Sequence, residues 1–407
     1  MTKSLSKYKG VVISDVHVGA IDDSKLSKEM KDVFIHDIYL DKQLDFIIID
    51  GDWFDRKFYL NEPSTATAMI LMEAICRRGV PVRVVYGTSS HEAGQYGVFE
   101  HAMTEINPNF KVIYNVCEEE LLPGLHVLYI PEEYIEDKRS YYKDYLYNGS
   151  KYDFIFGHGV IQEAMTMAAR SVTKQKQTRA KAPVFSSAEL ANACKGLVFF
   201  GHYHINTNID DKVFYVGSYS RWIHGEEEPK GFYRFTADTD KEVYGFEFIE
   251  NIYAEKYTTL HYGYRSKIFQ SQEEFMKEMD KIDELIRQGF YNHVRWDIHF
   301  PPNFEATEFM KKTLIAHYRD SKSTSMMFSE GEKNSGGGTV DAEEDEETKF
   351  LKQYDFIEDD SLGIEDKVQK FIEIKEERVI PVNHIRTYMS TDKIEDIVRI
   401  SQGNENE

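Results

Sequence analysis

Aspartate and histidine residues follow short apolar runs at five places in this chain. The runs GVVIS, DFIII, VRVVY, YDFIFG and LVFFG lead, in this order, to Asp15, Asp52, His91, His158 and His202. Near-continuous apolar runs are typical of strands that are buried on both faces of a sheet. Ligands gather beyond the carboxyl ends of such strands, so we predict that the five strand ends converge on one site.

These strand ends offer carboxylates and imidazoles with the spacing that a pair of cations requires. Asp15 and His17 alternate in DVH, and His202 and His204 alternate in HYH, so both members of a pair can point to one side. Asp52, in GDWFD, supplies a carboxylate that can bridge two cations. Two divalent ions about 3.5 to 4 Å apart can clamp a phosphate, activate a water and stabilise the leaving oxygen.

His158, in GHG, completes a mixed set of aspartate and histidine ligands. Such a set suits manganese, iron or zinc better than calcium or magnesium, which prefer shells made entirely of oxygen. The residues therefore predict two divalent metal ions and leave their identity open. Glycines beside the ligands fit places where the backbone turns sharply or approaches a ligand closely. These glycines are Gly51, Gly87, Gly157 and Gly201.

The order of the motifs DVH, GDWFD, GTSSHE, GHG and GHYH resembles the calcineurin-like metallophosphoesterase superfamily. The resemblance implies an α/β fold, a layered β-sandwich flanked by helices, with two divalent metal ions in the site. It also implies a ligand set for each ion. The ligands are Asp15, His17 and His204 for the first ion, His158 and His202 for the second, and Asp52 as the bridge.

The resemblance implies roles for two further side chains. His91 lies beside the phosphate without binding a metal, as a proton donor or transition-state stabiliser. Asp55 either is a carboxylate that orients His91 or a ligand, or is a surface acid. The family usually has GNHD or GNHE, with the asparagine on the second metal, whereas this chain has GTSSHE. Either Ser90 takes the place of that asparagine, or water does and the second metal binds more loosely.

Longer segments of the sequence resemble one smaller group within this superfamily. DVHVGA, FFGHYH and YVGSYSRWIHGEEEPKGFYRF are similar to the SbcD and Mre-eleven-type nucleases, over roughly Tyr8 to Tyr253. This implies a manganese-dependent DNA exonuclease and endonuclease that acts on double-strand ends or hairpins. Its partner would be an SbcC-like coiled-coil ATPase in DNA repair and recombination. The same site also allows a phosphatase or cyclic-nucleotide phosphodiesterase acting on a small ester, or a metal-stabilised scaffold without turnover.

Sequence patterns divide the chain into four parts. Residues 1–258 are predicted to form the metallophosphoesterase nuclease domain, with the alternating runs KVFYVGS and GFYRFTA in a second sheet. Residues 259–328 are predicted to form a smaller α+β DNA-capping domain. Residues 329–349 are rich in glycine, serine and acids and are predicted to be a flexible linker. Residues 350–407 are predicted to be a helical segment that binds the ATPase.

Periodic patterns define the elements of the capping domain. Ser271 and Glu274 form a capping box, which predicts that a helix starts there and can end at Gly289. HVRWDIHF alternates as a strand does, and Glu305 to His317 is predicted to be a second helix. Apolar residues at helical spacing line one face of the first helix. They are Phe275, Met279, Ile282 and Ile286.

The charge of the chain is unevenly spread. The sequence has 49 lysines and arginines and 70 aspartates and glutamates, a net charge of −21, which ordinarily counts against a nucleic-acid partner. The segment RSVTKQKQTRAK is different, because it contains basic residues and no acid. We expect it to contact a DNA backbone, although a solvated loop is the alternative. Its basic residues are Arg170, Lys174, Lys176, Arg179 and Lys181.

Two segments predict contacts with other chains. The helix expected over Ala66 to Arg78 has more apolar residues than one core-facing stripe uses, so we expect a homodimer. The C-terminal helices are too short to be stable alone, and we expect them to dock on the ATPase. No apolar run approaches the roughly 20 residues of a membrane span, and the N-terminus has no signal-like apolar core. We therefore expect a cytoplasmic protein without membrane contact.

Overall fold

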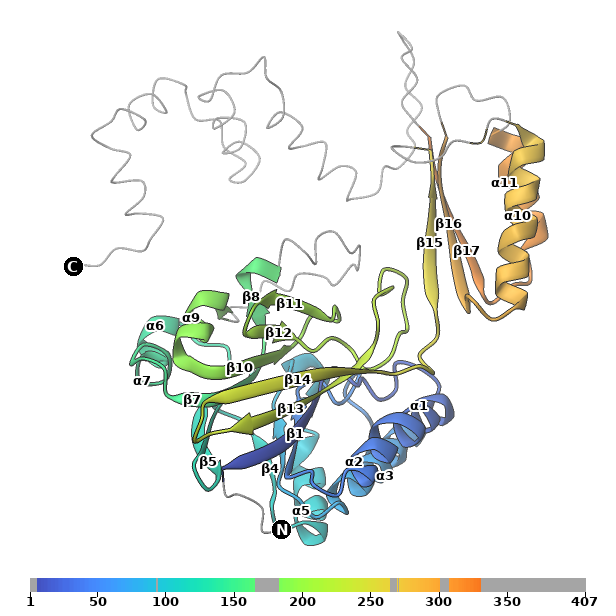
Figure 1. Cartoon of the computed structure of the whole chain (residues 1–407). Helices are drawn as coiled ribbons and strands as arrows, with labels where there is room; N and C mark the ends of the chain where they lie inside the picture. Colours follow the sequence, from blue (N-terminus) through green and yellow to red (C-terminus); the bar gives the residue numbers. More distant parts are fainter. Residues whose placement is uncertain are drawn as a thin grey trace, which may run out of the picture. The chain divides into compact units, whose positions relative to one another are not determined.

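The computed structural model describes most of the first 330 residues (Figure 1). All of the described residues lie in the first of two compact units, residues 1–332. The predicted linker from residue 331 onward, the predicted ATPase-binding segment 350–407 and the basic residues 170–181 lie outside the described residues. The described ranges are 6–92, 94–164, 183–263, 269, 271–300 and 307–330.

The first large sheet has six strands in the order β14-β13-β1-β2-β3-β4. Strands β1 to β4 are parallel, and β13 and β14 continue the sheet as antiparallel strands. Strand β2 is buried along its whole length, as its continuous apolar run predicts. The bounds are β1 Lys7–Ile13, β2 Phe46–Asp50, β3 Val82–Val85, β4 Phe110–Ile113, β13 Gly231–Asp238 and β14 Val243–Glu250.

The second large sheet also has six strands, in the order β11-β12-β10-β7-β6-β5. Its four central strands are parallel, and β11 and β5 are antiparallel to their neighbours. The bounds are β5 Cys117–Leu122, β6 Leu125–Ile130, β7 Tyr152–His158, β10 Cys194–Gly201, β11 Thr207–Asp210 and β12 Val213–Tyr215.

The two large sheets share one aromatic core. Phe235 of the first sheet packs against Phe154 and Phe199 of the second, with ring centroids 4.7 and 5.3 Å apart. These residues belong to a single buried cluster with members from both sheets. The predicted α/β class is therefore confirmed in its coarse form, as two mixed sheets packed face to face and flanked by helices.

Strand assignment differs from the sequence prediction at β13. This strand, GFYRFTAD, pairs with β1 in the first sheet, where Lys7 lies opposite Asp238. The prediction that both alternating runs after His204 lie in the second sheet is wrong for β13 and right for β12. Alternation shows that a strand has one buried face, but the partner strand is decided by backbone pairing across more than 200 residues of sequence.

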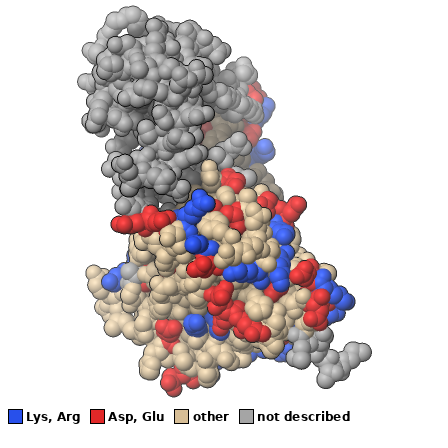
Figure 2. Space-filling model, turned by 90° about the vertical axis from the view of Figure 1, so that its left-hand side faces the viewer, with Lys and Arg blue, Asp and Glu red and all other residues tan. Residues whose placement is uncertain are grey.

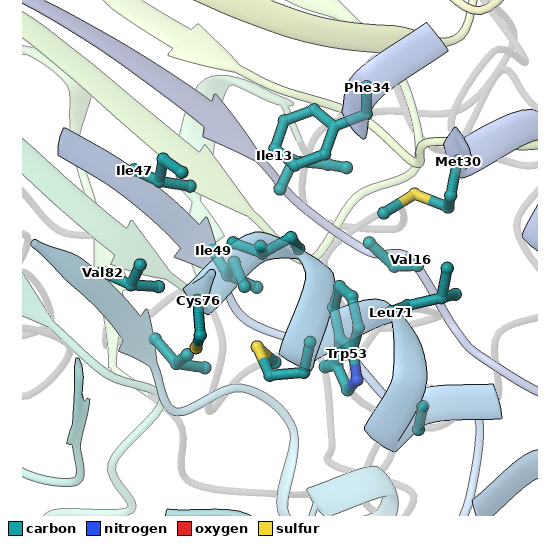
Figure 3. Packing of buried hydrophobic residues seen from close by; sticks show 14 of the residues in the cluster. Ile13, Val16, Met30, Phe34, Ile47, Ile49, Trp53, Leu71, Cys76 and Val82 are labelled. Carbon is teal, nitrogen blue, oxygen red and sulfur yellow. The ribbon is translucent and has the colours of Figure 1, made fainter. Parts of the chain in front are cut away.

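Helices cover the outer face of the first sheet. Figure 3 shows Ile13, Ile47 and Ile49 of the strands packed among Met30, Phe34 and other helix residues in one buried cluster. The elements are α1 Asp23–Glu29, the π-helical turn η1 Met30–Ile35, α2 His36–Leu40, α3 Pro63–Cys76, α4 Ser89–Glu92 and α5 Tyr96–Ile106.

Most of the apolar side chains of α3 that were expected to be exposed are buried in the core or packed partly against it. Met72 and Ile75 are buried, Met69 packs partly against the same core, and Ile70 is 55% exposed. Ile70 is therefore the main apolar side chain that this helix leaves for a second copy. Homodimerisation stays a prediction.

A second set of short elements packs on the outer face of the second sheet. Its apolar side chains form a cluster with Ile155 of β7 and Val198 and Phe200 of β10. These elements are α6 Lys138–Tyr141, α7 Lys143–Leu146, β8 Val160–Ile161, β9 Val184–Phe185 and α9 Ser187–Ala193.

Residues 257–330, where the capping domain is predicted, contain a separate sheet. It has three parallel strands, with β16 between β15 and β17. Its chain alternates strand and helix, so this part is of the α/β type and not the α+β type that the sequence predicts. It runs from residue 257 to residue 330, so its last strand extends beyond the expected linker start at 329. The elements are β15 Tyr257–Tyr262, α10 Gln272–Arg287, β16 His293–Phe300, α11 Thr307–His317 and β17 Thr324–Glu330.

The sequence patterns that predict the helix start, the buried helix face and the alternating strand of residues 257–330 are confirmed. The Ser271 side chain accepts a hydrogen bond from the backbone N–H of Glu274, 3.1 Å away, and caps α10. Phe275, Met279 and Ile282 are buried, and β16 alternates between half-buried and buried positions along its whole length. Among the described helices, none has the length and apolar character needed to cross a membrane.

Candidate metal centre

Strand ends from both large sheets meet at one place. Strands β1 and β2 of the first sheet, and β7 and β10 of the second, each end beside a buried polar group. Because the two sheets are packed face to face, side chains from the two sheets approach one another there. The side chains brought together are Asp15, His17, Asp52, His158, His202 and His204.

The backbone turns sharply at these residues. Of the five described non-glycine residues with positive φ, four lie here, and their φ angles are 47° for Asp15, 45° for His17, 46° for Asp52 and 110° for His202. Such conformations cost free energy and persist at sites where the surrounding structure enforces them. These turns lie where the side chains of the strand ends come together.

Gly201 is needed for the close approach of the two sheets. A Cβ atom there would lie 2.0 Å from Oγ of Ser14, 2.3 Å from the carbonyl oxygen of Asp50 and 2.8 Å from Cδ2 of His158. We therefore expect Gly201→Ala to destabilise the fold by about 1 to 3 kcal/mol through overpacking. Thermal unfolding should show a melting temperature lower by about 2 to 10 °C.

The matched control for this substitution is Gly97→Ala in α5. A Cβ atom at Gly97 meets nothing within 4 Å, and alanine favours helices, so the melting temperature should stay equal or rise slightly. Equal melting temperatures for wild type and Gly201→Ala would contradict the close approach of β10 to β1.

Asp15, His17 and His204 form the first candidate group for a metal ion. The Nε2 atoms of His17 and His204 lie 3.2 Å apart, and Oδ1 of Asp15 lies 3.8 and 3.9 Å from them. Ligand atoms about 2.1 Å from a shared ion are separated by about 3 to 4 Å. All three side chains are buried, so this spacing fits a cation among them.

Asp15, Asp52 and His158 form a second group. The Nε2 atom of His158 is buried, makes no hydrogen bond to the described residues, and lies 3.6 Å from Asp15 and 3.5 Å from Asp52. Oδ2 of Asp52 is also 3.7 Å from Nε2 of His17. Asp52 thus lies between the two imidazoles, as a bridging carboxylate would. These buried carboxylates and imidazoles could therefore hold a metal ion.

The electrostatics of the group favour cations. Burial raises the pKa of Asp15, but the interactions with the neighbouring imidazoles of His158 and His17 outweigh it and hold that pKa well below its ordinary value. Burial lowers the pKa of His158, but Asp52 and Asp15 outweigh it and raise that pKa well above its ordinary value. Buried carboxylates therefore stabilise positive charge at this place, and a metal ion supplies such charge.

Glu132 belongs to the site and is absent from the sequence prediction. Its Oε2 atom lies 3.0 Å from Nδ1 of His158 and 3.2 Å from Nδ1 of His202. Burial raises the pKa of Glu132, but His158 and His202 outweigh it and hold that pKa well below its ordinary value. The strand-end rule could have found this residue, because Glu132 follows the apolar run LHVLYI of β6.

The exposure of Ser90 counts against the first of its two alternatives, in which its hydroxyl takes the place of the asparagine. Ser90 is exposed within α4, whereas Thr88 faces the site. The backbone N–H of Thr88 donates to Oδ1 of Asp52 at 2.7 Å, and its hydroxyl lies 3.0 Å from Oδ2 of Asp52 and 3.1 Å from Oε2 of Glu132. Ser89 and Ser90 of GTSSHE thus lie in the short helix α4, where Ser90 is exposed and Thr88 is the hydroxyl residue beside Asp52.

His91 and Asp55 lie at the edge of the first group. The Nδ1–H of His91 donates to the main-chain oxygen of Asp55, which leaves Nε2 as the nitrogen that can face a substrate. The His91 ring lies edge-on to the His17 ring, with centroids 5.0 Å apart. The Asp55 carboxylate lies 3.8 Å from Nδ1 of His17. Asp55 therefore orients His91 through its backbone, and its side chain faces His17.

Residues of the loop after β12 complete the surroundings of His204. Nδ1 of His204 donates to Oε1 of Glu226 at 2.5 Å, and buried Lys230 donates to the main-chain oxygen of His204 at 2.6 Å. The half-buried ring of Trp222 lies 4.8 Å from the His204 ring and 5.0 Å from the His17 ring. These contacts fix the direction in which Nε2 of His204 points.

The predicted DNA-binding residues Arg170, Lys174, Lys176, Arg179 and Lys181 lie outside the described residues. On the face that Figure 2 shows, lysines and arginines of the described residues are interspersed with aspartates and glutamates. That face therefore presents mixed charge, and DNA contact stays a prediction.

No family model matches the chain, and no curated protein matches it. Among solved structures, it is similar to TT1561 of Thermus thermophilus, with 11% sequence identity and a TM-score of 0.33, over 59% of this chain and 98% of that chain. A second crystal structure has 13% identity and a TM-score of 0.33, over 60% of this chain and 99% of that chain.

Proposed function

We propose that this protein is a metal-dependent phosphodiesterase with two metal ions, and that its substrate is DNA. The observation that carries the proposal is the position of Asp52, whose Oδ2 atom lies 3.7 Å from His17 and 3.5 Å from His158. A buried carboxylate between two imidazoles is the arrangement that a pair of ions needs. Manganese suits the mixed oxygen and nitrogen ligands, as iron and zinc do.

The chain's own residues have separable tasks in this proposal. The first ion would be held by Asp15, His17 and His204, and the second by His158 and His202, with Asp52 shared between them. Bound ions supply Lewis-acid stabilisation of the phosphate charge and lower the pKa of water. His91, whose Nδ1–H is held by the Asp55 carbonyl, would present Nε2 toward the leaving oxygen, and in its doubly protonated form it can give that oxygen the Nε2 proton.

DNA as the substrate rests on the motif resemblance to SbcD and Mre-eleven-type nucleases. The α/β unit after residue 257 also supports it, because a small ester needs no second unit. The same resemblance supports a coiled-coil ATPase as partner, a homodimer, and work on DNA ends or hairpins in the cytoplasm. A phosphatase or cyclic-nucleotide phosphodiesterase is the second candidate, favoured by the mixed charge of the described face (Figure 2) and the net charge of −21.

A side-by-side cleavage assay tests the proposal. Metal-free protein would be supplied with manganese or magnesium and given linear duplex DNA, hairpin DNA or bis(p-nitrophenyl) phosphate. We expect manganese to support cleavage of both DNA substrates and of the chromogenic ester. Hydrolysis of the ester without DNA cleavage would favour the small-ester phosphodiesterase. Two bound metals without any hydrolysis would point to a scaffold.

A further inference from the structure

The two ring nitrogens of His204 have different neighbours. Nε2 lies 3.2 Å from Nε2 of His17 and 3.9 Å from Oδ1 of Asp15, within the first candidate group for a metal ion. Nδ1 points away from this group and lies 2.5 Å from Oε1 of Glu226. An imidazole that binds a metal ion commonly donates its other N–H to a carboxylate, which fixes the tautomer and the direction of the ring. Glu226 is in the position of such a carboxylate.

The Glu226 carboxylate is buried beside a positive charge. Glu226 is 1% exposed, Lys230 is fully buried, and Nζ of Lys230 lies 3.7 Å from Oε2 of Glu226. A buried carboxylate without a partner is costly in free energy, and a nearby ammonium offsets part of that cost. The same ammonium donates to the main-chain oxygen of His204 at 2.6 Å. Lys230 thus connects the Glu226 carboxylate with the backbone of the histidine that it faces.

Hydrogen bonds also restrain the backbone on either side of the Glu226 side chain. Nε of Arg221 donates to the main-chain oxygen of Glu226 at 2.8 Å, and Nη1 of Arg221 donates to the main-chain oxygen of Glu255 at 3.2 Å. The carboxylate of Glu227 accepts from the N–H of Thr259 at 2.6 Å. These contacts hold the loop from which Glu226 reaches His204.

We infer that Glu226 is a positioning residue for the first metal ion, because it keeps the proton of His204 on Nδ1 and leaves the lone pair of Nε2 for the ion. The inference rests on the proposed metal site and deepens it. It requires only the ion at Asp15, His17 and His204, so it can be tested separately from the number of ions. The negative charge beside the imidazole also makes Nε2 a stronger ligand.

Manganese titration of wild type, Glu226→Gln and Glu226→Ala tests the inference without measuring turnover. Glutamine keeps an oxygen that can accept the Nδ1–H bond but loses the charge, whereas alanine removes the acceptor. We expect the ion at His204 to bind about 10-fold more weakly in Glu226→Gln and about 100-fold more weakly in Glu226→Ala. The affinity for the other ion should change less in both variants. Partial rescue by glutamine is the result that a role in packing alone would not give.

Glu227→Gln is the matched control. Glu227 is the next residue, but it is exposed and its carboxylate accepts from Thr259 and not from His204. Manganese affinities should stay at the wild-type values in this variant. Circular dichroism shows whether each variant is folded. If Glu226→Ala unfolds because Lys230 loses its buried partner, the comparison of Glu226→Gln with Glu227→Gln still decides.

Anomalous diffraction from manganese-loaded wild-type crystals gives a second, independent test. Nε2 of His204 about 2.0 to 2.2 Å from an ion, with Nδ1 still on Glu226, supports the inference. An ion bound by Nδ1 of His204, or by Glu226 itself, overturns it.

The titration separates failure of this inference from failure of the proposed site. Wild-type affinities in both Glu226 variants, or equal weakening of both ions in Glu226→Gln, overturn the positioning role alone. Wild type that binds one ion, at Asp15, His17 and His204, with the expected losses in the variants, keeps the positioning role and overturns the two-metal site. Wild type that binds no ion at these residues overturns both.

Discussion

Asp52→Asn is expected to lower metal-dependent phosphodiester cleavage by more than about 1,000-fold, a loss of several kcal/mol in transition-state stabilisation. The Asp52 carboxylate is buried and is the group that lies between His17 and His158. Asparagine keeps its shape but removes the negative charge that would hold two cations together. Elemental analysis should therefore show less than two manganese ions per chain, with the secondary structure unchanged.

Asp50→Asn is the matched control for Asp52→Asn. Asp50 lies two residues earlier, at the end of β2, and burial raises its pKa well above the ordinary value. Burial therefore favours the neutral form of this carboxyl group, and asparagine is close to that form in shape and charge. Metal content and cleavage rate should stay near the wild-type values. Full manganese content in Asp52→Asn, with a rate within tenfold of wild type, would rule out a bridging role.

His91→Ala is expected to slow DNA cleavage by about 100-fold to 10,000-fold while both metal ions stay bound. His91 is oriented by the carbonyl of Asp55 and lies at the edge of the site, where it can reach a leaving oxygen. Single-turnover cleavage of duplex DNA and manganese content, measured on the same preparation, check both parts of this prediction.

The loss of rate in His91→Ala on two different substrates shows whether His91 donates a proton or only stabilises charge. A p-nitrophenolate leaving group needs little protonation, so His91→Ala should slow bis(p-nitrophenyl) phosphate hydrolysis far less than DNA cleavage. Equal losses on both substrates would exclude the proton-donor role. Loss of metal as complete as in Asp52→Asn would show that His91 belongs to the ligands.

The sequence by itself determined the local elements and most of the side chains that meet in the candidate metal centre. Apolar runs predicted the buried strands, because burial on both faces leaves no polar positions along them. The strand-end position of Asp15, Asp52 and His158 predicted their convergence, and the capping box at Ser271 predicted the start of α10. These signals depend on residues close together in sequence, so they can be seen without the fold.

Contacts between distant segments were decided only by the tertiary structure. The pairing of β13 with β1, and the parallel order of β15, β16 and β17, depend on which backbone edges meet, and side-chain periodicity does not encode this. The same holds in the site, where Glu132 lies beside histidines 26 residues and more away in sequence. The order of strands within the second sheet, with β7 between β6 and β10, brings Glu132 to His158 and His202, because the approach of side chains is fixed by the positions of whole strands.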